Sequence, residues 1–193
     1  MAQKLVILDR DGVINHDSIN YVKRVEEWIP YPSSIQAIAR LTKAGYRVAI
    51  ATNQSGIARQ YYNTDTLNQI HQRMSDIVTE AGGHLDHIAY CPHVDANECD
   101  CRKPRPGLLY QIQSALELPD LEGSWMVGDS LRDIQAGSRA GCQPVLVRTG
   151  NGNDTLRDCP DITRLVPGTL VFDDLASFVE QLLSASSKNT HTA

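Results

Sequence analysis

The sequence predicts an α/β fold, a single domain in which a parallel sheet is covered by helices on both faces. Short aliphatic runs alternate with amphipathic helical patterns from one end of the chain to the other. The first run, Leu5–Leu8, is apolar at every position, as in strands that are buried on both faces. Several runs end abruptly on Asp or Thr, which is typical of strand ends that bind ligands in open α/β sheets.

The strands are predicted from the apolar runs and the turn residues that bound them. Such runs are too short for helices and are rich in Val, Ile and Leu. We expect strands at residues 5–8, 46–51, 86–90, 124–128, 144–147 and 170–172.

The helices are predicted from apolar spacing and from their end signals. Apolar positions three residues apart predict a helix that runs through Ala44. Ser33 or Ser34 can cap its start, and Gly45 ends it. Thr64 can cap a second helix that reaches about residue 80 and ends before a Gly-Gly pair. Further helices are expected at 107–116, 131–140 and 175–183.

Length and composition limit what the chain can be. With 193 residues, 41% of them hydrophobic, the chain can bury one good core, which we expect to span residues 1–183 as a single domain, with 184–193 as a disordered tail. A formal net charge of −5 argues against a nucleic-acid partner. No apolar run approaches a membrane span or a signal-peptide core, so we expect a cytoplasmic protein without a membrane partner. We also expect a monomer.

Three predicted strands end on oxygen-bearing side chains. Asp9 and Asp11 follow the first strand, Thr52 follows the second, and Asp129 follows the run 124–128. Because parallel strands end at one edge of the sheet, these side chains should lie close together. Clustered carboxylates repel each other unless a cation lies between them, and Mg²⁺ prefers such oxygen ligands. The alternative is a set of ordinary Asp-rich turns.

A cluster of Cys and His residues predicts a second metal site. Cys91 and His93 are two residues apart, as are Cys99 and Cys101, so each pair can face one ion from an extended segment. Three thiolates and one imidazole form a closed tetrahedral set, which indicates structural Zn²⁺. Unrelated core cysteines are the alternative, but the surrounding Pro, Asp, Asn and Glu are poor core residues. Cys142 and Cys159 lie apart, at positions typical of a buried and a loop thiol.

The predicted zinc loop, residues 91–103, ends on two cations. Arg102 and Lys103 directly follow Cys101. A metal-fixed loop reduces the entropy that long basic side chains lose when they bind an anion. We therefore interpret the pair as phosphate ligands, against the alternative of a solvated charge pair.

With these residues in view, the chain resembles the haloacid dehalogenase (HAD) superfamily of phosphatases. Asp9-Arg10-Asp11-Gly12-Val13 is similar to its nucleophile motif, Thr52 and Lys103 to its second and third motifs, and Gly128-Asp129-Ser130 with Asp133 to its fourth. The run 52–59 and the motif Cys-Pro-His…Cys-x-Cys-Arg-Lys-Pro resemble the histidinol-phosphatase-like family. Ser55 and Ile57-Ala58-Arg59 resemble its members that act on a heptose 1,7-bisphosphate.

The resemblance implies a Mg²⁺-dependent phosphatase that works through an aspartyl-phosphate. Asp9 would be the nucleophile and Asp11 the general acid and base, with Mg²⁺ held by Asp9, Asp129 and the Asp11 backbone carbonyl. Thr52, the Asn53 backbone N–H and Lys103 would bind the phosphoryl oxygens. Asp133 would assist the metal through water or cap the helix that follows.

The resemblance also implies a set of substrate contacts. Since we expect no large cap domain, specificity would come from the 13–32 connection, the 54–62 loop and the zinc loop. Arg102 is the first candidate for the distal end of the substrate, with Lys23, Arg24 and Arg59 as further candidates. The implied substrate-binding residues are Arg10, Asp17, Ser18, Tyr21, Asn53, Gln54, Ser55 and Arg102.

Three other functions stay open at this point. A histidinol-phosphate phosphatase would share the zinc loop and the catalytic motifs. A sugar phosphomutase would share the paired Asp residues but usually needs a closing cap. A catalytically inactive, zinc-stabilised binding module would have no need of the complete set Asp9, Asp11, Thr52, Lys103 and Asp129.

Overall fold

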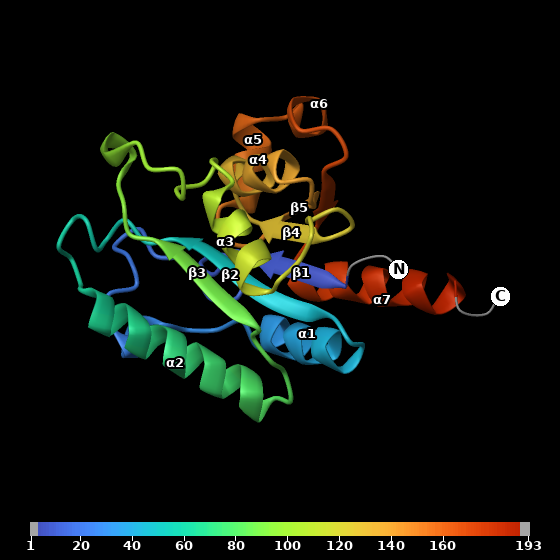
Figure 1. The fold of residues 1–193 in the computed structure, drawn as a ribbon, viewed down its shortest axis with the longest axis horizontal. Helices are drawn as coiled ribbons and strands as arrows, with labels where there is room; N and C mark the ends of the chain where they lie inside the picture. Colours follow the sequence, from blue (N-terminus) through green and yellow to red (C-terminus); the bar gives the residue numbers. More distant parts are fainter. Residues whose placement is uncertain (1–3, 190–193) are drawn as a thin grey trace.

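The computed structural model describes residues 4–189 and shows the predicted parallel sheet (Figure 1). Six strands lie in the order β3-β2-β1-β4-β5-β6, and every neighbouring pair is parallel. All six predicted strands are confirmed, two with the same bounds and four with bounds shifted by at most two residues. They are β1 (Leu5–Leu8), β2 (Arg47–Asn53), β3 (His87–Cys91), β4 (Trp125–Gly128), β5 (Gln143–Val147) and β6 (Leu170–Phe172).

The strand order places a topological switch between β1 and β4. From β1 the chain builds outward through β2 to β3, and it then returns to add β4, β5 and β6 on the other side. Ligands of open α/β sheets bind at the carboxyl ends of the strands at such a switch. Leu8 of β1 pairs with Val127 of β4, so Asp9 and Asp129 follow neighbouring strands at nearly the same level.

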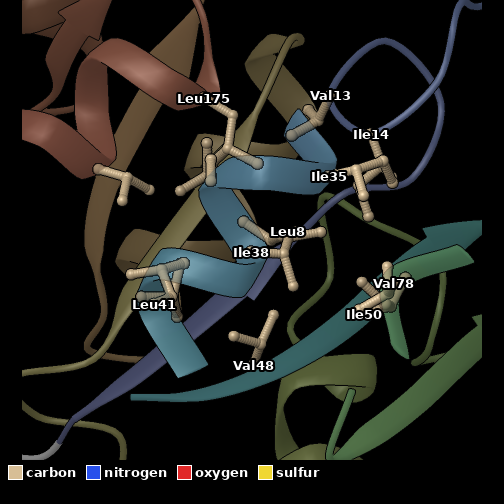
Figure 2. Close-up of a cluster of buried hydrophobic side chains, with 14 of the residues drawn as sticks. Leu8, Val13, Ile14, Ile35, Ile38, Leu41, Val48, Ile50, Val78 and Leu175 are labelled. Atoms are coloured by element: carbon tan, nitrogen blue, oxygen red, sulfur yellow. The ribbon is translucent and has the colours of Figure 1, made fainter. Parts of the chain in front are cut away.

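The sheet is covered on one face by α1 (Pro32–Lys43), α2 (Thr64–Glu80) and α7 (Leu175–Asn189). Figure 2 shows Ile35, Ile38 and Leu41 of α1 in the same buried cluster as Leu8 and Val48 of the sheet, with Ile38 beside Leu8. These side chains are at most 5% exposed. The predicted spacing of apolar residues in α1 therefore reflects the stripe that packs on the sheet.

The other face is covered by α3 (Gly107–Ala115) and α4 (Leu131–Arg139). Leu5 and Ile7 alternate with Val6 and Leu8 along β1, and the two pairs belong to the cores on opposite faces. This explains why the first strand is apolar at every position.

Both predicted helix caps are wrong, by two or three residues in the first helix and by one residue in the second. In α1 the N-cap is Tyr31, because Pro32 takes the first helical position, for which its fixed φ is suited. The Ser34 hydroxyl instead donates to the Val13 carbonyl at 2.7 Å. In α2 the N-cap is Asn63, whose side chain accepts the Thr66 N–H at 2.9 Å, so Thr64 is the first residue inside the helix.

Several elements lie outside the predicted set. Between β5 and β6 the chain forms α5 (Gly152–Asp158) and α6 (Ile162–Leu165), and short 3₁₀ helices η1 (Val25–Glu27) and η2 (Asp95–Asn97) lie in the connecting loops. These helices are too short to carry an apolar period, since α5 buries only Gly152 and α6 only Ile162.

The last helix is longer than predicted. α7 continues to Asn189, six residues past its predicted end, so residues 184–189 of the predicted disordered tail are helical. Residues 190–193 lie outside the described residues. Among residues 4–189, the helices are each too short or too polar to cross a membrane.

Candidate active site

A cavity of about 850 Å³ opens at the carboxyl ends of β1, β2 and β4. The strand-end residues and the zinc loop contribute to its wall together. Every residue predicted for catalysis, magnesium or substrate lines it: Asp9, Arg10, Asp11, Asp17, Ser18, Tyr21, Thr52, Asn53, Gln54, Ser55, Arg102, Lys103 and Asp129.

An acidic cluster of Asp9, Asp129 and Asp133 lies at the base of this cavity, and its carboxylate oxygens lie within 4.8 Å of one another. The Lys103 ammonium is 3.0 Å from Asp9 Oδ1 and 2.6 Å from Asp133 Oδ1, and it donates to the Ala51 carbonyl at 2.7 Å. One ammonium, paired with two of the three carboxylates, leaves the cluster with an excess of negative charge. A divalent cation would neutralise that excess, so the cluster fits the expected Mg²⁺.

The electrostatics of the cluster follow from its burial. Desolvation, followed by the charge of Asp133, raises the pKa of Asp9 well above its usual range. The same two causes raise the pKa of Asp129 to about 7. Burial lowers the pKa of Lys103, but the charges of Asp133 and Asp9 outweigh it and the net direction is upward. The cluster therefore favours a charged lysine and resists full ionisation of its carboxyl groups without a metal.

Asp133 caps the helix that follows, which is one of its two predicted roles, while its assistance to the metal stays a prediction. Oδ2 accepts from the Ser130 N–H at 3.0 Å and from its hydroxyl at 2.5 Å, which forms a capping box at the start of α4. Oδ1 faces Lys103 within the acidic cluster. A Cβ on Gly128 would lie 2.1 Å from the Asp133 Cβ, so this close approach requires glycine.

Asp11 lies beside the acidic cluster but directs its carboxylate elsewhere. Arg10 donates to both of its oxygens at 2.8 to 3.1 Å, Asn15 donates to Oδ1 at 2.9 Å and Gln54 to Oδ2 at 3.0 Å. Burial raises the pKa of Asp11, but the Arg10 charge and these hydrogen bonds outweigh it, and the pKa is lowered. The carboxylate is therefore held in its ionised, proton-accepting form.

Arg10 does not reach the open part of the cavity as a substrate contact would. Its side chain is 1% exposed and is held by Asp11, by Gln54 Oε1 at 3.2 Å and by His71 Nε2 at 3.4 Å. Burial, followed by the Arg10 charge, lowers the pKa of His71 to about 3, so its ring is neutral and can accept this bond. These bonds orient the Asp11 carboxylate, and the predicted contact of Arg10 with substrate stays a prediction.

His71 was not predicted as part of the site. It lies on α2 between the buried residues Leu67 and Met74, on the face that packs inward. A polar residue within an otherwise apolar helix face was the available sequence signal. Its partner Arg10, 61 residues away, could not be identified without the fold.

Asn53 uses its side chain to fix the zinc loop. Its Nδ2 donates to the Lys103 carbonyl at 3.1 Å, and its Oδ1 accepts the Lys103 N–H at 3.1 Å. The end of β2 is thereby joined to the residue that follows Arg102. The side-chain amide is occupied, while the predicted phosphate contact of the Asn53 backbone N–H stays a prediction.

The four predicted zinc ligands come together in the loop after β3. Cys101 Sγ lies 3.1 Å from Cys91 Sγ, 3.4 Å from Cys99 Sγ and 3.3 Å from His93 Nδ1. All four ligand atoms lie within 4.8 Å of one another, and the thiols are free rather than disulfide-bonded. Tetrahedral Zn–S bonds of about 2.3 Å separate ligand atoms by about 3.8 Å, so a zinc ion fits this cluster after slight expansion. Cys142 is buried and Cys159 lies at the cavity wall.

The predicted basic contacts divide into two groups. Arg102 and Arg59 line the cavity, and Arg102 is held by Asp95 at 2.5 Å and by the His93 carbonyl at 3.2 Å. Lys23 and Arg24 do not line it, because they bond within their own loop, to the Asn20 carbonyl and to Glu27, respectively. Nothing in this conformation supports the distal contacts expected from Lys23 and Arg24, which stay a prediction.

The opposite rim is formed by the loop of residues 16–21 and by a loop that was not predicted. Asp17 accepts from Asn151 Nδ2 at 2.7 Å, and Asn151 also donates to Asp129 Oδ2 from its backbone at 2.8 Å. Ser18 and Tyr21 line the cavity, with the Tyr21 ring against Tyr61. Asn151 follows β5 at the same sheet edge, so the rule that identified the other strand ends also applies to it.

Comparisons with known proteins agree with this geometry. The HAD-hydrolase-like family model matches residues 100–178. D-glycero-beta-D-manno-heptose-1,7-bisphosphate 7-phosphatase of Pseudomonas aeruginosa is 53% identical over 184 residues, which cover 95% of this chain and 99% of that protein. The protein of the same name from Neisseria meningitidis serogroup B is 47% identical over 184 residues, covering 95% and 97%.

Solved structures give the same result. The D,D-heptose 1,7-bisphosphate phosphatase of Bordetella bronchiseptica, complexed with magnesium and phosphate, superposes with a TM-score of 0.88 at 50% identity, covering 95% of this chain and 99% of that one. The phosphatase of the same name from Burkholderia thailandensis has a TM-score of 0.71 at 40% identity, covering 94% and 99%. The likeness extends over nearly the whole length of each protein.

Proposed function

Because this chain belongs to the family of D-glycero-beta-D-manno-heptose-1,7-bisphosphate 7-phosphatases, we propose that it hydrolyses the 7-phosphate of that sugar bisphosphate. The observation that carries the proposal is the acidic cluster with Lys103 at the base of the cavity, directly beside Thr52. This is the arrangement that covalent phosphoryl transfer to a carboxylate requires.

In the proposed reaction, an Asp9 oxygen attacks phosphorus, and the bond to the sugar oxygen breaks to leave an aspartyl-phosphate. Lys103 and Thr52 would hold the phosphoryl oxygens where negative charge develops. Asp9, Asp129 and the Asp11 backbone carbonyl would hold Mg²⁺, which supplies charge neutralisation between carboxylate and phosphate. Asp133 would keep Lys103 in position.

Asp11 would act first as acid and then as base. Its lowered pKa suits the second step, in which a carboxylate takes a proton from the water that attacks the aspartyl-phosphate. For the first step it must carry a proton to the leaving sugar oxygen. An incoming phosphate dianion raises the pKa of a nearby carboxyl group, so substrate binding itself favours that protonation.

The remaining parts of the proposal concern the surroundings of the reaction. The Cys91–His93–Cys99–Cys101 cluster would hold structural Zn²⁺ and so fix Arg102 at the cavity wall. Arg102 would contact the distal end of the sugar, and Asp17, Ser18, Tyr21 and Ser55 would contact its hydroxyl groups. We further propose a single-domain monomer that acts in the cytosol.

A phosphate-release assay tests the proposed function. The purified protein with Mg²⁺ is given heptose 1,7-bisphosphate or histidinol phosphate, and ³¹P NMR identifies the phosphate that remains on the sugar. We expect loss of the 7-phosphate alone and a much higher kcat/KM for the bisphosphate. Faster turnover of histidinol phosphate, or release of the 1-phosphate, would refute the proposed function.

A further inference from the structure

Gln54 lies just beyond β2, between the predicted phosphate ligand Thr52 and the predicted acid–base residue Asp11. Its side chain is 3% exposed, although it belongs to the cavity wall. Nε2 donates to Asp11 Oδ2 at 3.0 Å and to Thr52 Oγ1 at 2.8 Å. Oε1 accepts from Arg10 Nη2 at 3.2 Å and from the Tyr62 hydroxyl at 2.6 Å.

These four bonds use the full capacity of the amide. A Gln side chain offers two N–H donors and two acceptor lone pairs, and each has a partner here. The orientation of the amide is also determined, because Arg10 can only donate and an ionised Asp11 can only accept. Gln54 therefore has no polar atom left with which to bind substrate.

We infer that Gln54 is a positioning residue that acts through Thr52 and Asp11, and not the substrate contact predicted from the sequence. Thr52 Oγ1 accepts a bond from Gln54, so the Thr52 hydroxyl proton is left to point at another acceptor. In the reaction proposed above, on which this inference rests, that acceptor is a phosphoryl oxygen. Gln54 thus selects the donating state of the Thr52 hydroxyl and fixes the Asp11 carboxylate with the same amide.

The loop after Gln54 is built to hold this amide in place. The Tyr62 side chain is largely buried, and its hydroxyl closes the second acceptor position of Gln54. A Cβ on Gly56 would lie 2.3 Å from the Tyr62 ring, so the ring occupies space that only glycine leaves open. The segment 54–62 therefore holds the Gln54 amide in place through the Tyr62 hydroxyl.

Gln54→Glu is the decisive variant, because it keeps the size and the acceptor side of Gln54 but replaces its donors. The new carboxylate would repel Asp11 and would take the Thr52 hydroxyl proton for itself. Gln54→Met, which keeps the length without any hydrogen bond, serves as a second variant if Gln54→Glu unfolds. Gln36→Glu makes the same chemical change at an exposed position of α1, outside the cavity, and is the matched control.

Steady-state kinetics with Mg²⁺ are measured for the single variants, for Thr52→Val and for the double variant Thr52→Val/Gln54→Glu. We expect kcat to fall about 10²-fold for Gln54→Glu with KM changed less than about threefold, because orientation and not binding is lost. We expect the double variant to be no more than about tenfold worse than the poorer single variant, since residues that act as a unit are not additive. Gln36→Glu should match the wild type.

The inference is overturned if KM rises more than about tenfold with kcat retained, or if the effects at positions 52 and 54 multiply, as for independent contacts. All variants are also assayed with 4-nitrophenyl phosphate, which lacks the sugar. A wild type that cleaves this compound but not the heptose bisphosphate would refute the proposed function alone. The kcat and KM of the Gln54 variants on 4-nitrophenyl phosphate would still test whether Gln54 is a positioning residue.

Discussion

Replacing Lys103 by Met removes the ammonium that faces two carboxylates of the acidic cluster. The side chain is 1% exposed, and its Nζ lies 3.0 Å from Asp9 and 2.6 Å from Asp133. Met keeps most of the length of the stem, so the main loss is the charge. We expect this variant to lose stability as well as activity.

The size of the loss follows from the charges left behind. Two unit charges at about 4 Å interact by about 4 kcal/mol at an effective dielectric of 20. Removing one partner from a buried ion pair typically costs about 3–5 kcal/mol. We therefore expect the free energy of unfolding at pH 8, without added divalent metal, to fall by about 3–5 kcal/mol, a large share of the roughly 5–15 kcal/mol of a typical domain.

Urea unfolding measures this difference directly. The loss should shrink when Mg²⁺ is added, because the cation replaces the missing charge, and also at pH 5, where carboxyl groups with raised pKa values take up protons. Lys43→Met, an exposed change on α1, should alter stability by less than about 0.5 kcal/mol. A loss below about 1 kcal/mol for Lys103→Met, unaffected by Mg²⁺ or pH, would refute the electrostatic reasoning.

Three further changes test other parts of the site. Asp9→Asn should abolish phosphate release while circular dichroism shows an intact fold, and measurable turnover would exclude Asp9 as the nucleophile. Cys99→Ser should lose zinc in metal analysis and weaken substrate binding more than Mg²⁺ binding, whereas wild-type protein without zinc would contradict the zinc assignment. The pKa of Asp129 is about 4 in an unfolded chain, and burial raises it to about 7 in the folded protein. Ionisation of Asp129 therefore lowers the free energy of unfolding of the metal-free protein, and this loss grows as the pH rises from about 4 to about 7. Asp129→Asn should therefore be more stable than the wild type at pH 8 in urea unfolding and lose this advantage at pH 4, and equal stabilities at pH 8 would contradict the raised pKa.

The residues at strand ends could be predicted because one topological rule places them. Asp9, Thr52 and Asp129 each follow an apolar run, and in a parallel sheet such ends meet at one edge. The Cys/His cluster was predictable for a local reason, since its four residues lie within eleven positions of the chain. Neither prediction required knowledge of which side chains pack against which.

The roles of Arg10, Gln54 and His71 could not be predicted because they depend on packing between distant segments. The Arg10–His71 contact spans 61 positions and the Arg10–Gln54 bond spans 44. The family resemblance implied that Arg10 and Gln54 bind substrate, since they lie next to the catalytic positions in the sequence. Their burial, on which the positioning role inferred for Gln54 partly rests, became visible only with α2 and the 54–62 loop in place.

The predicted N-caps of the helices were wrong for a different reason. Ser33, Ser34 and Thr64 are all good capping residues, but Pro32 and Asn63 precede them and occupy the relevant positions. Choosing among adjacent candidates requires the backbone path into the helix. The short helices α5 and α6 carry too few buried residues for any period to show.

The central position of β1 has a consequence for how activity is regained on refolding. β1 pairs with β2 from the first half of the chain and with β4 from the second. A fragment that stops before residue 124 contains Asp9 and Thr52 but lacks the strand that delivers Asp129. Helical signal can return while the two halves are still apart, whereas turnover must wait until β4 has docked against β1.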